Sequence, residues 1–288
     1  VRVMGAVLII NAFNIIHIAQ LTRILNFKLK AQATLIGVLI SGVLSITAAI
    51  NGFGVWSLVL QQLSNRFFTT LFLWIKSRWK PSFKVSFRSF KGMFSFGIWI
   101  LFGGIIQAIF TNIYTLTIGK FFSLTQLGFY DKANRLQQYG SEYPSQAITS
   151  VAFSLFSRNQ NDNLKLYNNL KQILNFTVGF ITPLLLILMI VAEPFVILIL
   201  TDKWAPMIPY LQLLCVIGMM YPINLLNIQI LLAKGKSKLN FKLQLIKSTL
   251  RIINLIVMYP FGINFIILGE IIVSVIALFI NTYYTKIL

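Results

Sequence analysis

Residues 11–29, NAFNIIHIAQLTRILNFKL, and residues 224–243, NLLNIQILLAKGKSKLNFKL, are diverged copies of one stretch. The second copy begins 213 positions after the first (224 − 11). A Phe-Gly pair follows each copy where a new apolar stretch starts, and its glycines, Gly54 and Gly262, lie 208 positions apart (262 − 54). Internal repeats in apolar sequence are typical of transporters whose substrate site lies between two homologous halves. The repeat therefore predicts a two-lobed membrane transporter.

The composition agrees with a membrane protein. Hydrophobic residues make up 57% of the chain and the mean hydropathy is +0.79, which excludes an ordinary soluble domain. The formal net charge of +19 would suit a nucleic-acid partner. The basic residues, however, fall in short clusters between apolar stretches, so we expect no nucleic acid to bind. With one histidine, one cysteine and no glycine-rich phosphate loop, we expect neither an enzyme nor a metal or cofactor site.

Nine stretches are long and apolar enough to be membrane-spanning helices, since a crossing needs about 20 residues. The fifth is the weakest by hydropathy. They are 3–21, 34–51, 55–75, 94–118, 125–150, 173–192, 207–233, 243–260 and 263–284.

The charged loops predict the orientation. Every second loop is basic, and the loops between carry only Lys120 and Lys203. Basic loops lie in the cytoplasm, so Val1 starts outside and Leu288 ends inside, provided that the fifth stretch crosses. The basic clusters lie at 23–30, 76–91, 158–171 and 234–247, with Arg251 one turn further in, and at 286.

The repeat and the span count together predict the domain organisation. The first three spans match the last three, and an even offset of six spans makes the repeats parallel. A full lobe then has six helices. We expect 1–80 to be the last three helices of a first lobe, 81–93 a connecting helix and 94–288 a complete second lobe. About 120 residues would then precede Val1 in the full protein.

The connecting segment 81–93 has an aromatic face beside a basic face. This pattern favours a helix lying in the cytoplasmic membrane interface, although a helix packed on the protein would show it too. The two faces are Phe83, Phe87 and Phe90, and Lys84, Arg88 and Lys91.

The fifth span carries a polar stripe at spacings of three and four residues. Such a stripe cannot face lipid, where an ionised group costs several kcal/mol, so it lines a wet cavity or joins the helix to polar partners. Asp131 and Arg135 can pair along the stripe, and Lys132 lies beside it. The stripe consists of Asp131, Asn134, Arg135, Gln138, Glu142, Ser145 and Thr149.

Arg66 is the second intramembrane feature, about 15 Å from either end of its span at 1.5 Å per residue. An arginine at this depth indicates a functional site, unless it pairs with a carboxylate elsewhere in the protein. Gln62 flanks it, and Gln107 belongs to a milder polar stripe in the fourth span. Glu270 in the last span would either couple a proton or sodium ion or be an exposed end group. We therefore expect a cationic cavity that binds an anionic headgroup through its guanidinium groups.

Several stretches resemble the bacterial polysaccharide biosynthesis proteins, the oligosaccharide-lipid flippases of the multidrug/oligosaccharidyl-lipid/polysaccharide exporter superfamily. The resemblance covers essentially the whole chain. It is carried by FGVWSLV at 53–59, SRWKP at 77–81, FSFG at 94–97, IGKFF at 118–122, LGFY at 127–130 and AEPF at 192–195.

The resemblance implies an all-α fold of two six-helix lobes, with two further C-terminal helices in many members. It also implies translocation of undecaprenyl-diphosphate-linked oligosaccharides across the bacterial inner membrane by alternating access. Polysaccharide polymerase and glycosyltransferases would be partners. A cation-coupled drug exporter of the same fold and a non-transporting scaffold for glycosyltransferases are the alternatives. The substrate-binding residues that we expect are Arg66, Arg135, Lys132, Asp131, Gln138, Glu142, Gln62 and Gln107, with Glu270 for ion coupling.

Overall fold

The computed structural model describes residues 2–77 and 86–286, and this part of the chain is helical with no strand. Its contacts fall into two compact units, one ending at Val85 and the other beginning at Ser86. The boundary lies inside the predicted connecting segment.

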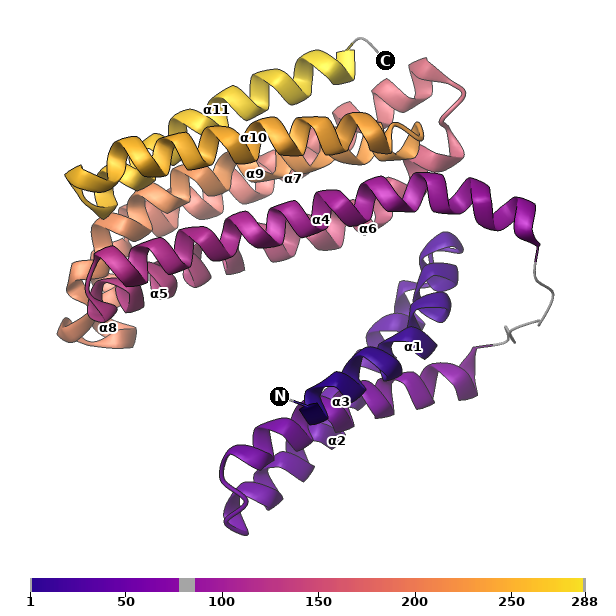
Figure 1. Ribbon diagram of the computed structural model, residues 1–288, viewed down its shortest axis with the longest axis horizontal. Helices are drawn as coiled ribbons and strands as arrows, with labels where there is room; N and C mark the ends of the chain where they lie inside the picture. Colours follow the sequence, from indigo (N-terminus) through magenta and orange to yellow (C-terminus); the bar gives the residue numbers. More distant parts are fainter. Residues whose placement is uncertain (1, 78–85, 287–288) are drawn as a thin grey trace. The chain divides into compact units, whose positions relative to one another are not determined.

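The first unit is a three-helix bundle of α1 (Ala6–Arg23), α2 (Phe27–Ile50) and α3 (Val55–Lys76), preceded by the short η1 (Arg2–Gly5). The third helix, α3, packs on both of the others, while α1 and α2 touch little (Figure 1). Gly37 permits the close approach of α2 to α3, because a Cβ there would lie 3.0 Å from the backbone oxygen of Asn65.

The second unit contains the remaining helices, which run largely alongside one another (Figure 1). They are α4 (Phe87–Phe121), α5 (Leu124–Gly140), α6 (Glu142–Arg158), α7 (Asn163–Ile190), α8 (Ala192–Leu200), η2 (Asp202–Met207), α9 (Ile208–Ala233), α10 (Ser237–Met258), η3 (Tyr259–Phe261) and α11 (Ile263–Lys286).

The central helix of this unit is α9, which packs on α5, α6, α7 and α11. Small residues bring these helices together, as is usual where lipid supplies no hydrophobic driving force. A Cβ on Gly218 of α9 would meet the Gln137 amide and lie 2.9 Å from Leu185 Cδ1. By contrast, α4 packs mainly on α10, so it forms an edge of the bundle.

The predicted fifth span is a bent helix rather than a straight one. It divides into α5 and α6 at Ser141, but the Ser141 backbone N–H still donates to the Gln137 carbonyl and the Ser145 N–H to that of Ser141, each at 3.0 Å. The Gln137 side-chain amide also donates to the Ser141 hydroxyl. Both halves pack along α9, so the segment continues through the bend.

Six of the nine predicted spans are helices long and apolar enough to cross a membrane within the described residues: α1, α2, α4, α7, α9 and α11. The other three, α3, α5–α6 and α10, are also helices, and each packs against one or more of those six. The protein is therefore an all-α, multi-span membrane protein, and the count of nine crossings stays a prediction.

Over the part of the predicted connecting helix that the structure describes, no break separates it from the fourth span. Residues 87–93 are the first turns of α4, which runs unbroken from Phe87 to Phe121. Ser86 caps its start by accepting a hydrogen bond from the Ser89 N–H at 3.3 Å. The rest of the segment, 81–85, lies outside the described residues. Its placement in the membrane interface stays a prediction.

The helix packing repeats between the two copies, but the helices correspond at a different offset from that of the matched residues. As α3 packs on α1 and α2, so α11 packs on α9 and α10. The helix before the turn ends at Arg23 in the first copy (α1) and at Ala233 in the second (α9), so the two turns lie 210 positions apart (233 − 23). The matched residues of the two sequence stretches lie 213 to 214 positions apart. The difference is about one helical turn, so the matched residues still share a face. Gly54 and Gly262 do correspond, since both have positive φ directly before α3 and α11.

Candidate functional site

The polar residues around Arg66 divide into two groups on α3. Asn65 donates to the Ser41 hydroxyl of α2 at 3.4 Å, and Thr69 packs against Gly37. These two residues join α3 to α2. Arg66 and Gln62 are exposed on the surface of the first unit.

The predicted stripe on α5–α6 is divided in a similar way. Ser145 and Thr149 are buried within the bundle. The charged members lie nearer the surface: Asp131 and Glu142 are half-buried, Arg135 is exposed, and no ion pair joins Asp131 to Arg135 among the residues described. The stripe is thus partly packing surface and partly accessible.

Two further predicted residues of this stripe are Gln138 and Lys132. Gln138 and Glu142 are both half-buried, on either side of the bend at Ser141. The Lys132 ammonium lies over the Trp204 ring, 5.7 Å from its centroid. A cation held against an aromatic face is attracted by the ring electrons.

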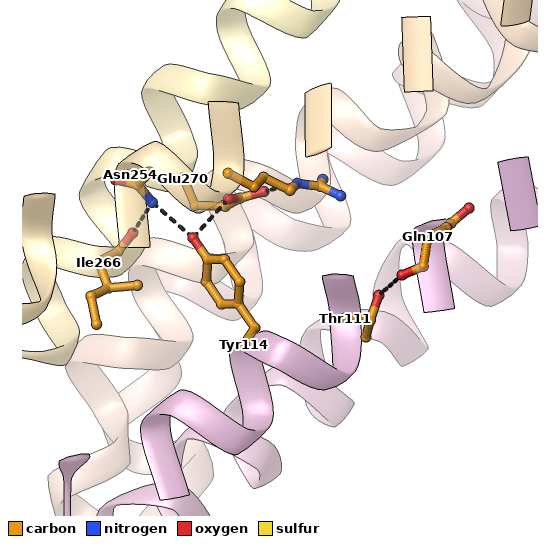
Figure 2. Close-up of polar contacts among 7 residues, drawn as sticks. Gln107, Thr111, Tyr114, Asn254, Ile266 and Glu270 are labelled. Carbon is orange, nitrogen blue, oxygen red and sulfur yellow. Dashed lines mark hydrogen bonds and ion pairs between the residues drawn. The ribbon is translucent and has the colours of Figure 1, made fainter. Parts of the chain in front are cut away.

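A cavity of about 310 Å³ lies in the second unit between α4, α9, α10 and α11. Gln107 of α4 lines it, and the Thr111 hydroxyl bonds to the Gln107 backbone oxygen at 2.9 Å (Figure 2). The cavity wall is amphipathic. Its polar members are Gln107, Tyr221, Asn224, Asn240, Gln244, Lys247, Arg251 and Ser274.

Lys247 is the cation of this cavity that lacks a counter-charge. Its side chain lies inside the bundle, and the residue is only 7% exposed. Among the residues that the structure describes, no carboxylate forms an ion pair with it, and the charge acting on it is that of Arg251, which has the same sign. Burying an ammonium group without a partner costs several kcal/mol. Lys247 is therefore a candidate group for binding an anion in this cavity.

Arg251 lies one turn from Lys247 and is held by a carboxylate. Its Nε donates to Glu270 Oε1 at 2.7 Å, and the Glu270 side chain is only 15% exposed. Glu270 is thus an internal ion-pair partner and not the exposed end group that the sequence left open. An ion-coupling role would require this pair to open, and that role stays a prediction.

The same carboxylate connects three helices. Tyr114 of α4 donates to Glu270 Oε2 at 3.2 Å, and Asn254 of α10 donates to the Tyr114 hydroxyl at 2.8 Å and to the Ile266 carbonyl at 3.0 Å (Figure 2). Figure 2 shows Tyr114 pointing from α4 toward Asn254 and Glu270. Since α4 is otherwise an edge helix, this network fixes α4 to α10 and α11 beside the cavity.

Sequence reasoning missed the polar face of α10. The charge pattern places Lys247 in a basic loop cluster with Arg251 one turn further in, but the connection between α9 and α10 is only 234–236, and both residues lie well inside α10. The signal was present, because the polar residues of this helix recur at spacings of three and four. They are Asn240, Gln244, Lys247, Arg251 and Asn254.

Comparisons with known proteins agree on the family. The family described as polysaccharide biosynthesis protein matches residues 1–209. The lipopolysaccharide biosynthesis protein WzxC of Escherichia coli (strain K12) is 32% identical over 173 residues, which is 60% of this chain and 35% of WzxC. The teichuronic acid biosynthesis protein TuaB of Bacillus subtilis (strain 168) is 28% identical over 58% of this chain and 34% of TuaB.

A third relative and a solved structure are also similar to this chain. The succinoglycan biosynthesis transport protein ExoT of Rhizobium meliloti (strain 1021) is 24% identical over 74% of this chain and 43% of ExoT. The chain thus spans between a third and a half of these relatives' lengths. A structure of MATE in the bent conformation matches with a TM-score of 0.83 at 16% identity, over 99% of this chain and 67% of that one. This likeness shows the fold.

Proposed function

Because the chain belongs to the polysaccharide biosynthesis protein family, we propose that it acts in the translocation of a lipid-linked oligosaccharide across a bacterial inner membrane. The substrate would be an undecaprenyl-diphosphate-linked repeat unit for a surface polysaccharide. Its diphosphate is the anion and its sugars are the polar part that must cross the lipid. Translocation would proceed by alternating access of two lobes.

The observation that carries the proposal is the buried ammonium of Lys247 in a cavity otherwise rich in amides. Glu270 neutralises Arg251, so Lys247 leaves the cavity with a net positive charge. A phosphate group would balance this charge and bind the Arg251 guanidinium as well. Gln107, Asn240 and Gln244 offer the amides that hydroxyl groups of sugars bind.

The residues singled out in the sequence have supporting roles in this proposal. Arg66 and Gln62 on α3 are proposed substrate-binding residues of the first unit. The accessible residues of α5–α6 would line the polar path for the sugars. These are Asp131, Lys132, Arg135, Gln138 and Glu142.

The proposal also gives the chain a membrane orientation and protein partners. The basic loops and the C-terminal end of the chain would face the cytoplasm, where the lipid-linked unit is made. A polysaccharide polymerase would receive the unit on the other side, and glycosyltransferases would supply it.

Export of cationic drugs is less well supported by the site. One structural neighbour is described as a multidrug resistance MATE family transporter of the MOP superfamily. A cationic drug needs an available carboxylate in the membrane. The carboxylate beside this cavity already accepts bonds from Arg251 and Tyr114, and the cavity itself carries positive charge. A non-transporting scaffold would need no buried cation at all.

Deletion of the full-length gene tests the proposal. We expect loss of surface glycan and accumulation of the polyprenyl-diphosphate-linked repeat unit, both restored by the wild-type gene. Lipid-linked units can be extracted and quantified by mass spectrometry. Unchanged surface glycan together with a new sensitivity to cationic drugs would instead support the drug exporter.

A further inference from the structure

A second cationic site lies at the start of α10, outside the cavity just described. It is a pocket of about 630 Å³ between residues 92–99 of α4 and the start of α10, and Lys236, Lys238 and Lys242 line it. None of the described residues that line it is acidic. The hydroxyls of Ser95 and Ser237 add hydrogen-bonding groups to the same wall.

Aromatic side chains form one wall of this pocket. The Lys238 ammonium lies over the Trp99 ring at 5.5 Å, and Phe241 packs on Trp99 with their ring centroids 5.3 Å apart. Tryptophan and lysine side by side at the end of a membrane helix are typical of the lipid headgroup region. Lys238 lies in the first turn of α10, so its contact with Trp99 favours a pocket at the level of the headgroups.

The pocket and the cavity lie on different sides of α10. Lys242 and Lys247 are five positions apart (247 − 242), a rotation of about 140° in an α-helix. The two sites share no lining residue. Lys238 and Lys242 therefore do not belong to the substrate cavity.

An exposed apolar strip continues from these lysines along the same face of α10. It contains Leu245, Ile253 and Ile256, which are 44%, 50% and 67% exposed. Their spacing from Lys238 along α10 places all three on the same helical face as that lysine. A phosphate-binding pocket followed by an apolar strip has the shape and polarity of one phospholipid molecule.

We propose that this pocket binds the headgroup of an anionic membrane phospholipid, whose acyl chains lie along the Leu245–Ile256 strip. Basic pockets between transmembrane helices recognise anionic headgroups through charge and hydrogen bonds. The bound lipid would hold residues 92–99 of α4 against the start of α10, beside the stretch 100–107 of α4 that contributes to the cavity. The site does not depend on what the protein transports.

The test is a lipid titration of the purified full-length protein, followed by native mass spectrometry. Phosphatidylglycerol and phosphatidylcholine are compared on the wild type and on Lys238→Gln/Lys242→Gln. The matched control is Lys28→Gln/Lys30→Gln, which removes two charges from the start of α2, the corresponding helix of the first unit. We expect the wild type to prefer phosphatidylglycerol and the α10 variant to lose affinity about tenfold or more, since each lysine near the membrane surface contributes about fivefold.

The control variant should stay within about twofold of the wild type, because Lys28 and Lys30 do not line the pocket and contribute only to the overall charge of the surface. Equal losses in both double variants would overturn the proposal, because any basic surface would then suffice. Equal binding of the two phospholipids would also overturn it. A third arm adds undecaprenyl phosphate: if this lipid displaces phosphatidylglycerol from the wild type but not from the α10 variant, the pocket serves the substrate and not a membrane phospholipid.

Discussion

Replacing Lys247 with Met will reduce surface glycan per molecule of protein about tenfold or more, because a charge-assisted bond to phosphate contributes about 1.5–3 kcal/mol. The methionine side chain fills a similar volume without the buried charge. The variant should therefore be as stable as the wild type or more stable, since an ammonium group with no counter-charge no longer has to be desolvated. The measurement is surface glycan in the deletion strain, divided by the amount of protein in the membrane.

Two variants control this prediction. Lys171→Met removes an exposed lysine from α7 and should leave surface glycan unchanged. Lys247→Arg keeps the charge and should retain part of the activity, although the larger side chain must fit a packed site. Wild-type glycan from Lys247→Met would show that the cavity charge does not hold the substrate.

Replacing Arg66 with Ala in the full-length protein will also abolish most surface glycan while leaving membrane expression intact. The expectation rests on an exposed arginine in the middle of a helix, where lipid contact would be costly and an anionic substrate would be a favourable partner. Arg66→Lys should retain partial function, because the charge survives while the two-pronged guanidinium contact is lost. Surface glycan per unit of membrane protein is again the measurement.

The alternatives for Arg66 give different results. Gln61→Ala, an exposed neighbour on α3, should behave as wild type. A purely structural Arg66 would reduce the amount of protein and make no difference between Ala and Lys in function per molecule. An arginine that pairs with a carboxylate elsewhere would let neutralisation of that carboxylate rescue Arg66→Ala. Wild-type glycan from Arg66→Ala would end its assignment to the substrate site.

Hydropathy was enough to predict the helical fold, and two matching stretches were enough to predict the repeat, because both signals are summed over many residues. Hydropathy does not predict the bend at Ser141, which lies three positions before Pro144 (144 − 141), a residue with no N–H to donate to the Gly140 carbonyl. Nor could it detect that 87–93 continues into α4, because an amphipathic start and an apolar middle are compatible with one helix as well as two. The repeat register was misplaced by about one turn because a helix returns to the same face after 3.6 residues.

The candidate site was harder to predict than the fold. A polar stripe alone does not distinguish a packing surface from a cavity wall: Ser145 and Thr149 are packed, whereas Arg135 on the same stripe is exposed. On α10, the basic residues were interpreted as topology signals because they follow a basic loop. Only the packing of α10 against α4 and α11 places Lys247 and Arg251 inside the bundle and brings Glu270 to Arg251.

The most direct measurement of the central claim is photocrosslinking of the substrate to the cavity. A photoreactive amino acid is introduced at Gln244, which lines the cavity, or at Ile253, nine positions along α10 (253 − 244) and on its opposite, exposed face. The full-length protein is expressed in cells that make a radiolabelled lipid-linked repeat unit. The account predicts that the probe at Gln244 captures the glycan, that Lys247→Met abolishes this capture, and that the probe at Ile253 captures none. Capture at Ile253 alone, or capture at Gln244 that Lys247→Met leaves unchanged, would contradict it.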